Sequence, residues 1–129
     1  MLPVTDLFVR GGTAVITLDT LRAFGADVDS GLARCMNNEA FYIRMVKLAL
    51  SDPSGIEKLG AALAAKDVRS AFEAAHSLKG VYANLSLTPV FEPVSALTEI
   101  ARAGSLDGTD ELFEKFKEKY AELEALADE

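Results

Sequence analysis

Apolar residues recur at intervals of three and four along most of the chain, and this spacing fits little besides helices. In a helix of about 3.6 residues per turn such positions share one face, which must be buried against another element. Similar stripes run through residues 39–50, 53–65, 67–85, 88–103 and 109–126. The last of these carries its stripe on Leu112, Phe113, Phe116, Tyr120, Leu123 and Leu126. The chain is therefore predicted to be all-α.

Residues that cap helices divide the chain into these segments. Thr17 is expected to begin a short helix that ends at Phe24 before a left-handed Gly25, and Asp27 a second one that runs through Met36. Later starts are predicted at Asn38, Pro53, Asp67, Thr88 and Thr109. Pro93 should bend its helix or delay the start, because proline lacks a backbone N–H. Short connections favour antiparallel neighbours, so we predict an up-and-down antiparallel four-helix bundle with short additional N-terminal helices.

Length, charge and cysteine content narrow the class of protein. A chain of 129 residues fits one domain, which we place at residues 18–129 after an N-terminal arm at 1–17. The net charge of −7 argues against binding to nucleic acid or to anionic membrane surfaces. No apolar run approaches the length of a membrane span. The single cysteine, Cys35, cannot form an internal disulfide, which favours the reducing cytoplasm.

The one histidine of the chain, His76, lies in the stretch AAHSLKGVYANL, within the helix predicted over 67–85. At about 100° per residue, one side of this helix faces the bundle and the other faces solvent. The inner side comprises Ala71, Ala74, Ala75, Leu78, Val81, Tyr82 and Leu85. The outer side comprises Arg69, Phe72, Glu73, His76, Lys79, Gly80 and Ala83. His76 is therefore predicted to face outward, with Lys79 and Gly80 one turn further along.

Gly80 has two interpretations. It ends the helix as a left-handed cap, or it lies within a continuing helix at a cost of about 1 kcal/mol relative to alanine. The apolar period favours the second, because Tyr82 and Leu85 stay in phase with Leu78. The missing side chain then leaves space beside the imidazole for a bulky group.

The outward set of His76, Lys79 and Gly80 indicates phosphoryl chemistry, although each residue alone is ordinary. A neutral imidazole is a good nucleophile near neutral pH, and an ammonium group offsets phosphoryl charge. Two other chemistries fit poorly. Glu73 and His76 form an E-x-x-H pair, but a di-iron bundle needs a second histidine. Ser77 points about 100° around the helix from His76, which gives no support for a hydrolytic triad.

The stretch AHSLKGVYANLS resembles the H-x-L-K-G motif of histidine-containing phosphotransfer (HPt) domains. The order of helices over residues 18–127 is similar as well. Two features depart from the family pattern. Val81 and Tyr82 replace small residues, and both are expected to point inward. Ser86 replaces the glycine after Leu85, and serine adopts the left-handed conformation that ends a helix less readily than glycine does.

The resemblance implies a role in two-component signal transduction. His76 would accept a phosphoryl group from a receiver-domain aspartate and pass it to another, with Lys79 stabilising its charge and Gly80 giving access. The chain would be a phosphocarrier, not an enzyme, without a kinase domain of its own. It would bind no metal or other cofactor, since Mg²⁺ is expected on the partner receiver. We expect a monomer that binds response-regulator receiver domains, a hybrid histidine kinase, or both.

Receiver docking would cover the face around His76, which includes Arg69, Phe72, Glu73 and Ala83. For Phe72 a second interpretation stays open, in which its ring folds onto a neighbouring helix. An alternative function is a helical protein–protein adaptor in which the phosphotransfer motif is vestigial.

Overall fold

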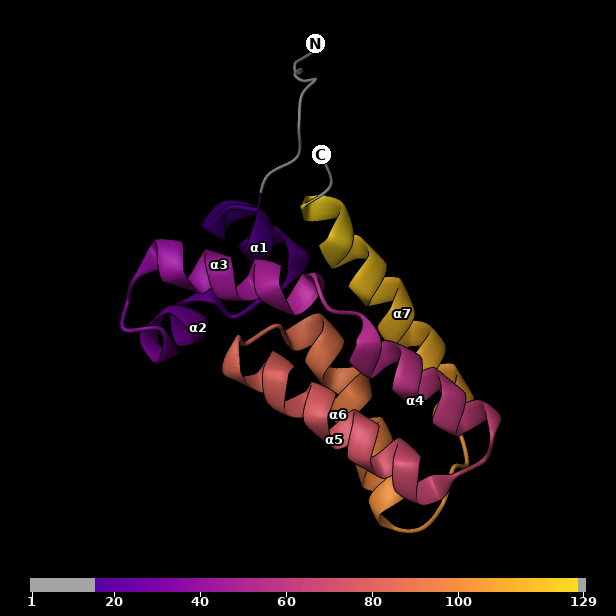
Figure 1. The fold of residues 1–129 in the computed structure, drawn as a ribbon. Helices are drawn as coiled ribbons and strands as arrows, with labels where there is room; N and C mark the ends of the chain where they lie inside the picture. Colours follow the sequence, from indigo (N-terminus) through magenta and orange to yellow (C-terminus); the bar gives the residue numbers. More distant parts are fainter. Residues whose placement is uncertain (1–15, 128–129) are drawn as a thin grey trace.

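The computed structural model describes residues 16–127, and this part of the chain consists of seven helices joined by short turns (Figure 1). They are α1 (Leu18–Phe24), α2 (Val28–Arg34), α3 (Glu39–Leu50), α4 (Ser54–Ala64), α5 (Val68–Asn84), α6 (Thr88–Arg102) and α7 (Thr109–Leu126). No strand occurs among these described residues, and the all-α prediction is confirmed. Most of the predicted arm, residues 1–15, lies outside them.

The predicted N-terminal caps are present at Thr17, Asp27, Asn38 and Asp67. In each case the side chain accepts a hydrogen bond from the backbone N–H three residues further on, which satisfies a donor that the helix itself cannot pair. Gly25 ends α1 with a left-handed φ of 115°, as expected. These local rules therefore set the starts of four helices before any tertiary contact is considered.

Two boundaries differ from the sequence-based expectation. Helix α2 ends at Arg34 and not at Met36, because Met36 and Asn37 take left-handed φ values of 59° and 57°. Helix α6 begins at Thr88 and continues through Pro93, so the proline does not delay its start. Pro93 is the sixth residue of α6, so the helix lacks only the one hydrogen bond that an N–H there would donate to the carbonyl of Pro89.

The core forms where α4, α5, α6 and α7 pack together. Each of these helices packs against the next, and α7 also contacts α4. Figure 1 shows them as one group, with α1–α3 gathered at one end of it. The fully buried large side chains of the group are Leu59, Leu97, Phe116 and Leu123, joined by Val90 and Val94. Helix α5 lies between α4 and α6, so one of its faces is buried and the other is open.

Helices α2 and α3 hold the turn that joins α5 to α6. The hydroxyl of Tyr42 on α3 donates a buried hydrogen bond of 2.8 Å to the carbonyl oxygen of Leu85. The backbone N–H of Asp27 donates to the carbonyl oxygen of Ser86 at 2.9 Å, and the hydroxyls of Ser30 and Ser86 lie 3.1 Å apart. Ser86 takes a left-handed φ of 54°. These contacts offset the strain of that conformation in a residue that is not glycine.

Replacing Tyr42 with phenylalanine should lower the free energy of unfolding by about 1–2 kcal/mol, because the carbonyl of Leu85 loses its buried donor. Tyr120→Phe is the matched control, since its hydroxyl lies 3.4 Å from the carbonyl oxygen of Leu50 and should contribute less than about 0.5 kcal/mol. Urea denaturation of both variants measures the difference. Equal losses of unfolding free energy in the two variants would show that the Tyr42 hydrogen bond contributes no more stability than the longer Tyr120 contact.

Candidate functional site

Helix α5 passes through Gly80 without interruption and ends at Asn84. Gly80 is not among the residues with positive φ, so its interpretation as a helix-ending cap is wrong. A Cβ built at Gly80 would meet nothing within 4 Å. The residue is exposed, and the space next to it is open on the solvent side. The interpretation of Gly80 as an interior helical glycine is confirmed.

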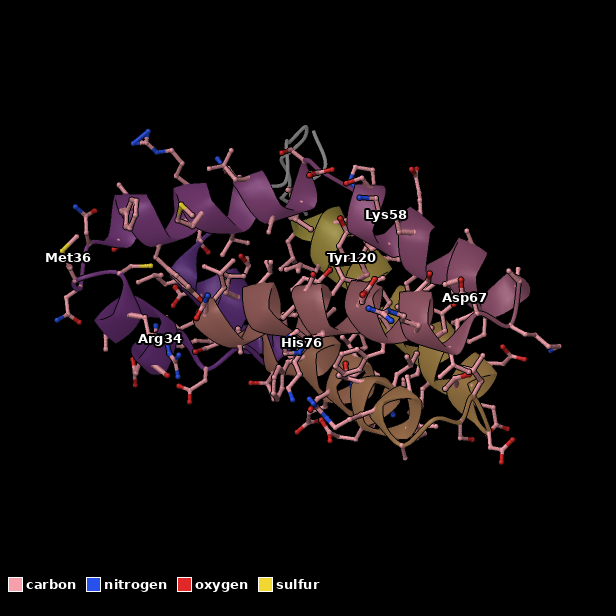
Figure 2. All side chains as sticks on the ribbon, turned by 60° about the horizontal axis from the view of Figure 1, so that its bottom comes forward. Arg34, Met36, Lys58, Asp67, His76 and Tyr120 are labelled. Atoms are coloured by element: carbon pink, nitrogen blue, oxygen red, sulfur yellow. The ribbon has the colours of Figure 1, made fainter. Side chains whose placement is uncertain are left out.

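His76 lies on the exposed face of α5, four residues before Gly80. Figure 2 shows its side chain at the edge of α5 away from α4, the helix that carries Lys58. The imidazole stacks on the ring of Phe72, with centroids 5.5 Å apart and planes inclined by 13°. Because Phe72 precedes His76 by one turn, this contact arises within α5 itself. It restricts the orientation of the imidazole without burying it.

Phe72 also contacts α6. The guanidinium carbon of Arg102 lies 4.9 Å from the centroid of the Phe72 ring, a cation–π arrangement. The ring is half-buried. Phe72 is therefore held between its own helix and a charged side chain of the neighbouring one, which agrees with the interpretation that it folds onto a neighbour. Its docking role stays a prediction.

Lys79 is paired with a carboxylate of α6. Its Nζ lies 3.4 Å from Oε2 of Glu99, and its side chain is 28% exposed. Glu99 also accepts a hydrogen bond of 3.1 Å from Nε of Arg102. The hydrogen bond from Arg102, followed by that from Lys79, holds the pKa of Glu99 below its usual value. The carboxylate is therefore ionised at neutral pH and pairs with two cations.

The remaining predicted residues lie along the same face of α5. Arg69 and Glu73 are exposed and form an ion pair at 3.4 Å, and Ala83 is half-buried. Val81 is 42% exposed, so the prediction that it points inward is wrong. Helix α4 begins at Ser54, and a Cβ built at Gly55 in its first turn would lie 2.9 Å from Leu78. The start of α4 therefore lies beside the turn of α5 that precedes Val81.

Glu99 and Arg102 were missed by the sequence analysis. Their spacing of three residues does indicate an ion pair along one helix, and the structure shows it at 3.1 Å. No signal in the sequence places that pair beside Lys79 and Phe72, since this depends on how α6 packs against α5. Within residues 16–127, no three His, Cys, Asp or Glu side chains gather as metal ligands would. None of the helices described here is both long enough and apolar enough to cross a membrane.

The fold and the site together define an all-helical protein with one exposed histidine on a central, continuous helix. The family model of the Hpt domain matches residues 51–126, which is more than half of the chain, and the protein belongs to that family. The match spans α4–α7 and includes the whole of α5. Hpt domains are histidine phosphotransfer modules of phosphorelays, and they are phosphocarriers, not kinases. Comparison with curated proteins and with solved structures gives no match.

Replacing Gly80 with alanine should raise the free energy of unfolding by up to about 1 kcal/mol, because alanine is the better helix former and its Cβ meets no neighbour. Gly31→Ala is the control with the opposite sign. A Cβ at Gly31, also helical, would overlap the ring of Tyr42, and overpacking of this kind costs about 1–3 kcal/mol. Thermal melts of the two variants test whether Gly80→Ala stabilises the protein and Gly31→Ala destabilises it. A lower melting temperature for Gly80→Ala would contradict the open position seen here.

Proposed function

We propose that His76 is the phosphoryl acceptor of this Hpt domain, and that it carries the group between receiver-domain aspartates of a phosphorelay. The observation that supports this most is the open environment of one histidine on an unbroken helix: His76 is exposed, and nothing lies within 4 Å of a Cβ at Gly80. A receiver active site can approach the imidazole over that position. The matched family supplies the class of reaction.

The transfer needs an imidazole nitrogen with a free lone pair and a phosphodonor that carries a good leaving group. The unprotonated ring nitrogen of His76 attacks the phosphorus of an aspartyl phosphate. A P–N bond forms, the P–O bond to the aspartate breaks, and the carboxylate leaves with the electron pair of that bond. The other ring nitrogen keeps its proton during the attack. The second transfer runs the same exchange in reverse, onto the aspartate of another receiver.

The chain itself supplies the acceptor and part of the charge stabilisation. Lys79, one turn after His76, brings an ammonium group to the phosphoryl oxygens. Mg²⁺ is expected on the receiver, where it would offset the charge of the aspartyl phosphate. This division of labour makes the protein a phosphocarrier that depends on its partners, which are receiver domains, a hybrid histidine kinase, or both.

The docking face is proposed to surround His76 on α5 and to include Arg69, Phe72, Glu73 and Ala83. Beneath it, α4–α7 would form an up-and-down antiparallel four-helix bundle that acts as a rigid support. We propose a monomer located in the cytoplasm. The buried free thiol of Cys35 is compatible with a reducing compartment.

The alternative is a helical adaptor that binds a partner without carrying phosphate. No contact among residues 16–127 favours it over phosphotransfer. Mixing the protein with a phosphorylated receiver separates the two, because phosphohistidine is acid-labile. An acid-stable label, or no label, would favour the adaptor.

Replacing His76 with glutamine should abolish phosphoryl acceptance. The free energy of unfolding should change by no more than about 0.5 kcal/mol, as for ordinary surface substitutions. Transfer from a phosphorylated receiver, followed by acid treatment of the product, measures the acceptance. An acid-labile label that persists in the folded glutamine variant would show that the acceptor lies elsewhere.

Replacing Gly80 with glutamine should leave α5 intact and slow the transfer by at least about tenfold, because the new side chain would occupy the open space beside His76. Ala83→Gln, one turn further along the same docking face, adds equal bulk away from His76 and should slow the transfer less than Gly80→Gln. Rates of transfer from the receiver are compared with labelling by a small phosphodonor, which needs less space. Undiminished transfer from the receiver to Gly80→Gln would refute the access role of the glycine.

A further inference from the structure

Glu99 on α6 pairs with two cations, Lys79 on α5 and Arg102 on α6. It contacts Nζ of Lys79 at 3.4 Å, and Nε and Nη2 of Arg102 at 3.1 and 3.4 Å. Its side chain is about half exposed. A single carboxylate therefore pairs with both cations and offsets one of their two positive charges.

Both cations belong to side chains that border His76 or its stacking partner. Lys79 follows His76 by three residues on α5, so the two side chains are neighbours on the helix surface. Arg102 lies over the ring of Phe72, and that ring stacks on the imidazole. The carboxylate of Glu99 is thus held by one cation that neighbours His76 along α5 and by another that contacts the stacking partner of His76.

We propose that Glu99 competes with the phosphoryl group on His76 for Lys79 and Arg102, and so shortens the lifetime of the phosphorylated histidine. This inference rests on the proposed function. In the unmodified protein the carboxylate holds both cations. A phosphoryl group carries more charge and three acceptor oxygens, so it draws at least one cation away from Glu99. The displaced carboxylate then lies close to a second anion, and this raises the free energy of the phosphorylated state.

The carboxylate of Glu99 is ionised when it competes with the phosphoryl group for the two cations. Its pKa is held below the usual value, first by Arg102 and then by Lys79, so it stays an anion throughout the neutral range. A carrier benefits from such a competitor, because a phosphoryl group that is held too strongly is not passed on. Glu99 is therefore a positioning residue that acts through the two cations and does not touch the reacting atoms.

The test uses the full chain and phosphoramidate, a small donor that needs no receiver. Ammonia leaves phosphoramidate as the P–N bond to the imidazole forms. After removal of the donor, the decay of phosphohistidine is followed by ³¹P NMR in the wild type and in Glu99→Gln, which keeps the shape and removes the charge. Exposed ion pairs are weak, so we expect the half-life to lengthen by about two- to fivefold, and less at high salt.

Glu92→Gln is the matched control, since it removes the same charge from α6, and Glu92 forms no ion pair among residues 16–127. Its half-life should equal that of the wild type. An equal lengthening in Glu92→Gln, or an unchanged or shorter half-life in Glu99→Gln, would overturn the proposal. Melting temperatures of both variants verify that the fold is kept.

A second comparison separates competition for cations from direct repulsion. In a background carrying Lys79→Ala and Arg102→Ala, Glu99→Gln should no longer change the half-life. If it still lengthens the half-life by the same factor, Glu99 acts on the phosphoryl group directly, and the proposed competition for the cations is refuted. If phosphoramidate labels the wild type but not at His76, the proposed function fails and this inference with it. Labelling at His76 with no effect of Glu99→Gln would refute the inference alone.

Discussion

The burial of one face of α5 is the constraint on which the site depends. Ala71, Ala75, Leu78 and Tyr82 are buried between the neighbouring helices. An unbroken helix has no freedom to rotate one side chain independently of the others, so this burial fixes His76 on the opposite, exposed face. The continuity of the helix through Gly80 matters for the same reason, because a stop there would release Tyr82 and the turn that follows.

The electrostatic character of the site comes from α6. Lys79 and Phe72 belong to α5, yet each is held by a side chain of the adjacent helix, Glu99 in one case and Arg102 in the other. The two residues of α6 are themselves paired. Close packing of α5 on α6 therefore builds a small network of charges next to an imidazole that remains open to solvent.

The end of α5 is secured by a part of the chain that the family match does not cover. The matched residues, 51–126, begin just before α4. Tyr42 on α3 and Asp27 before α2 nevertheless hydrogen bond to the backbone of the turn between α5 and α6. Because Ser86 in this turn adopts a left-handed conformation without glycine, these bonds replace what a glycine would supply through its own flexibility.

Local rules in the sequence determined the helices, most of their caps and the outward face of His76. The reason is that capping and apolar period act over a few residues and need no knowledge of neighbours. The exposure of Val81, the partner of Lys79 and the contact between Arg102 and Phe72 were decided by the tertiary structure. Each of these depends on where one helix starts or lies against another. Helical period gives the direction of a side chain from its axis, but only packing fixes what stands in that direction.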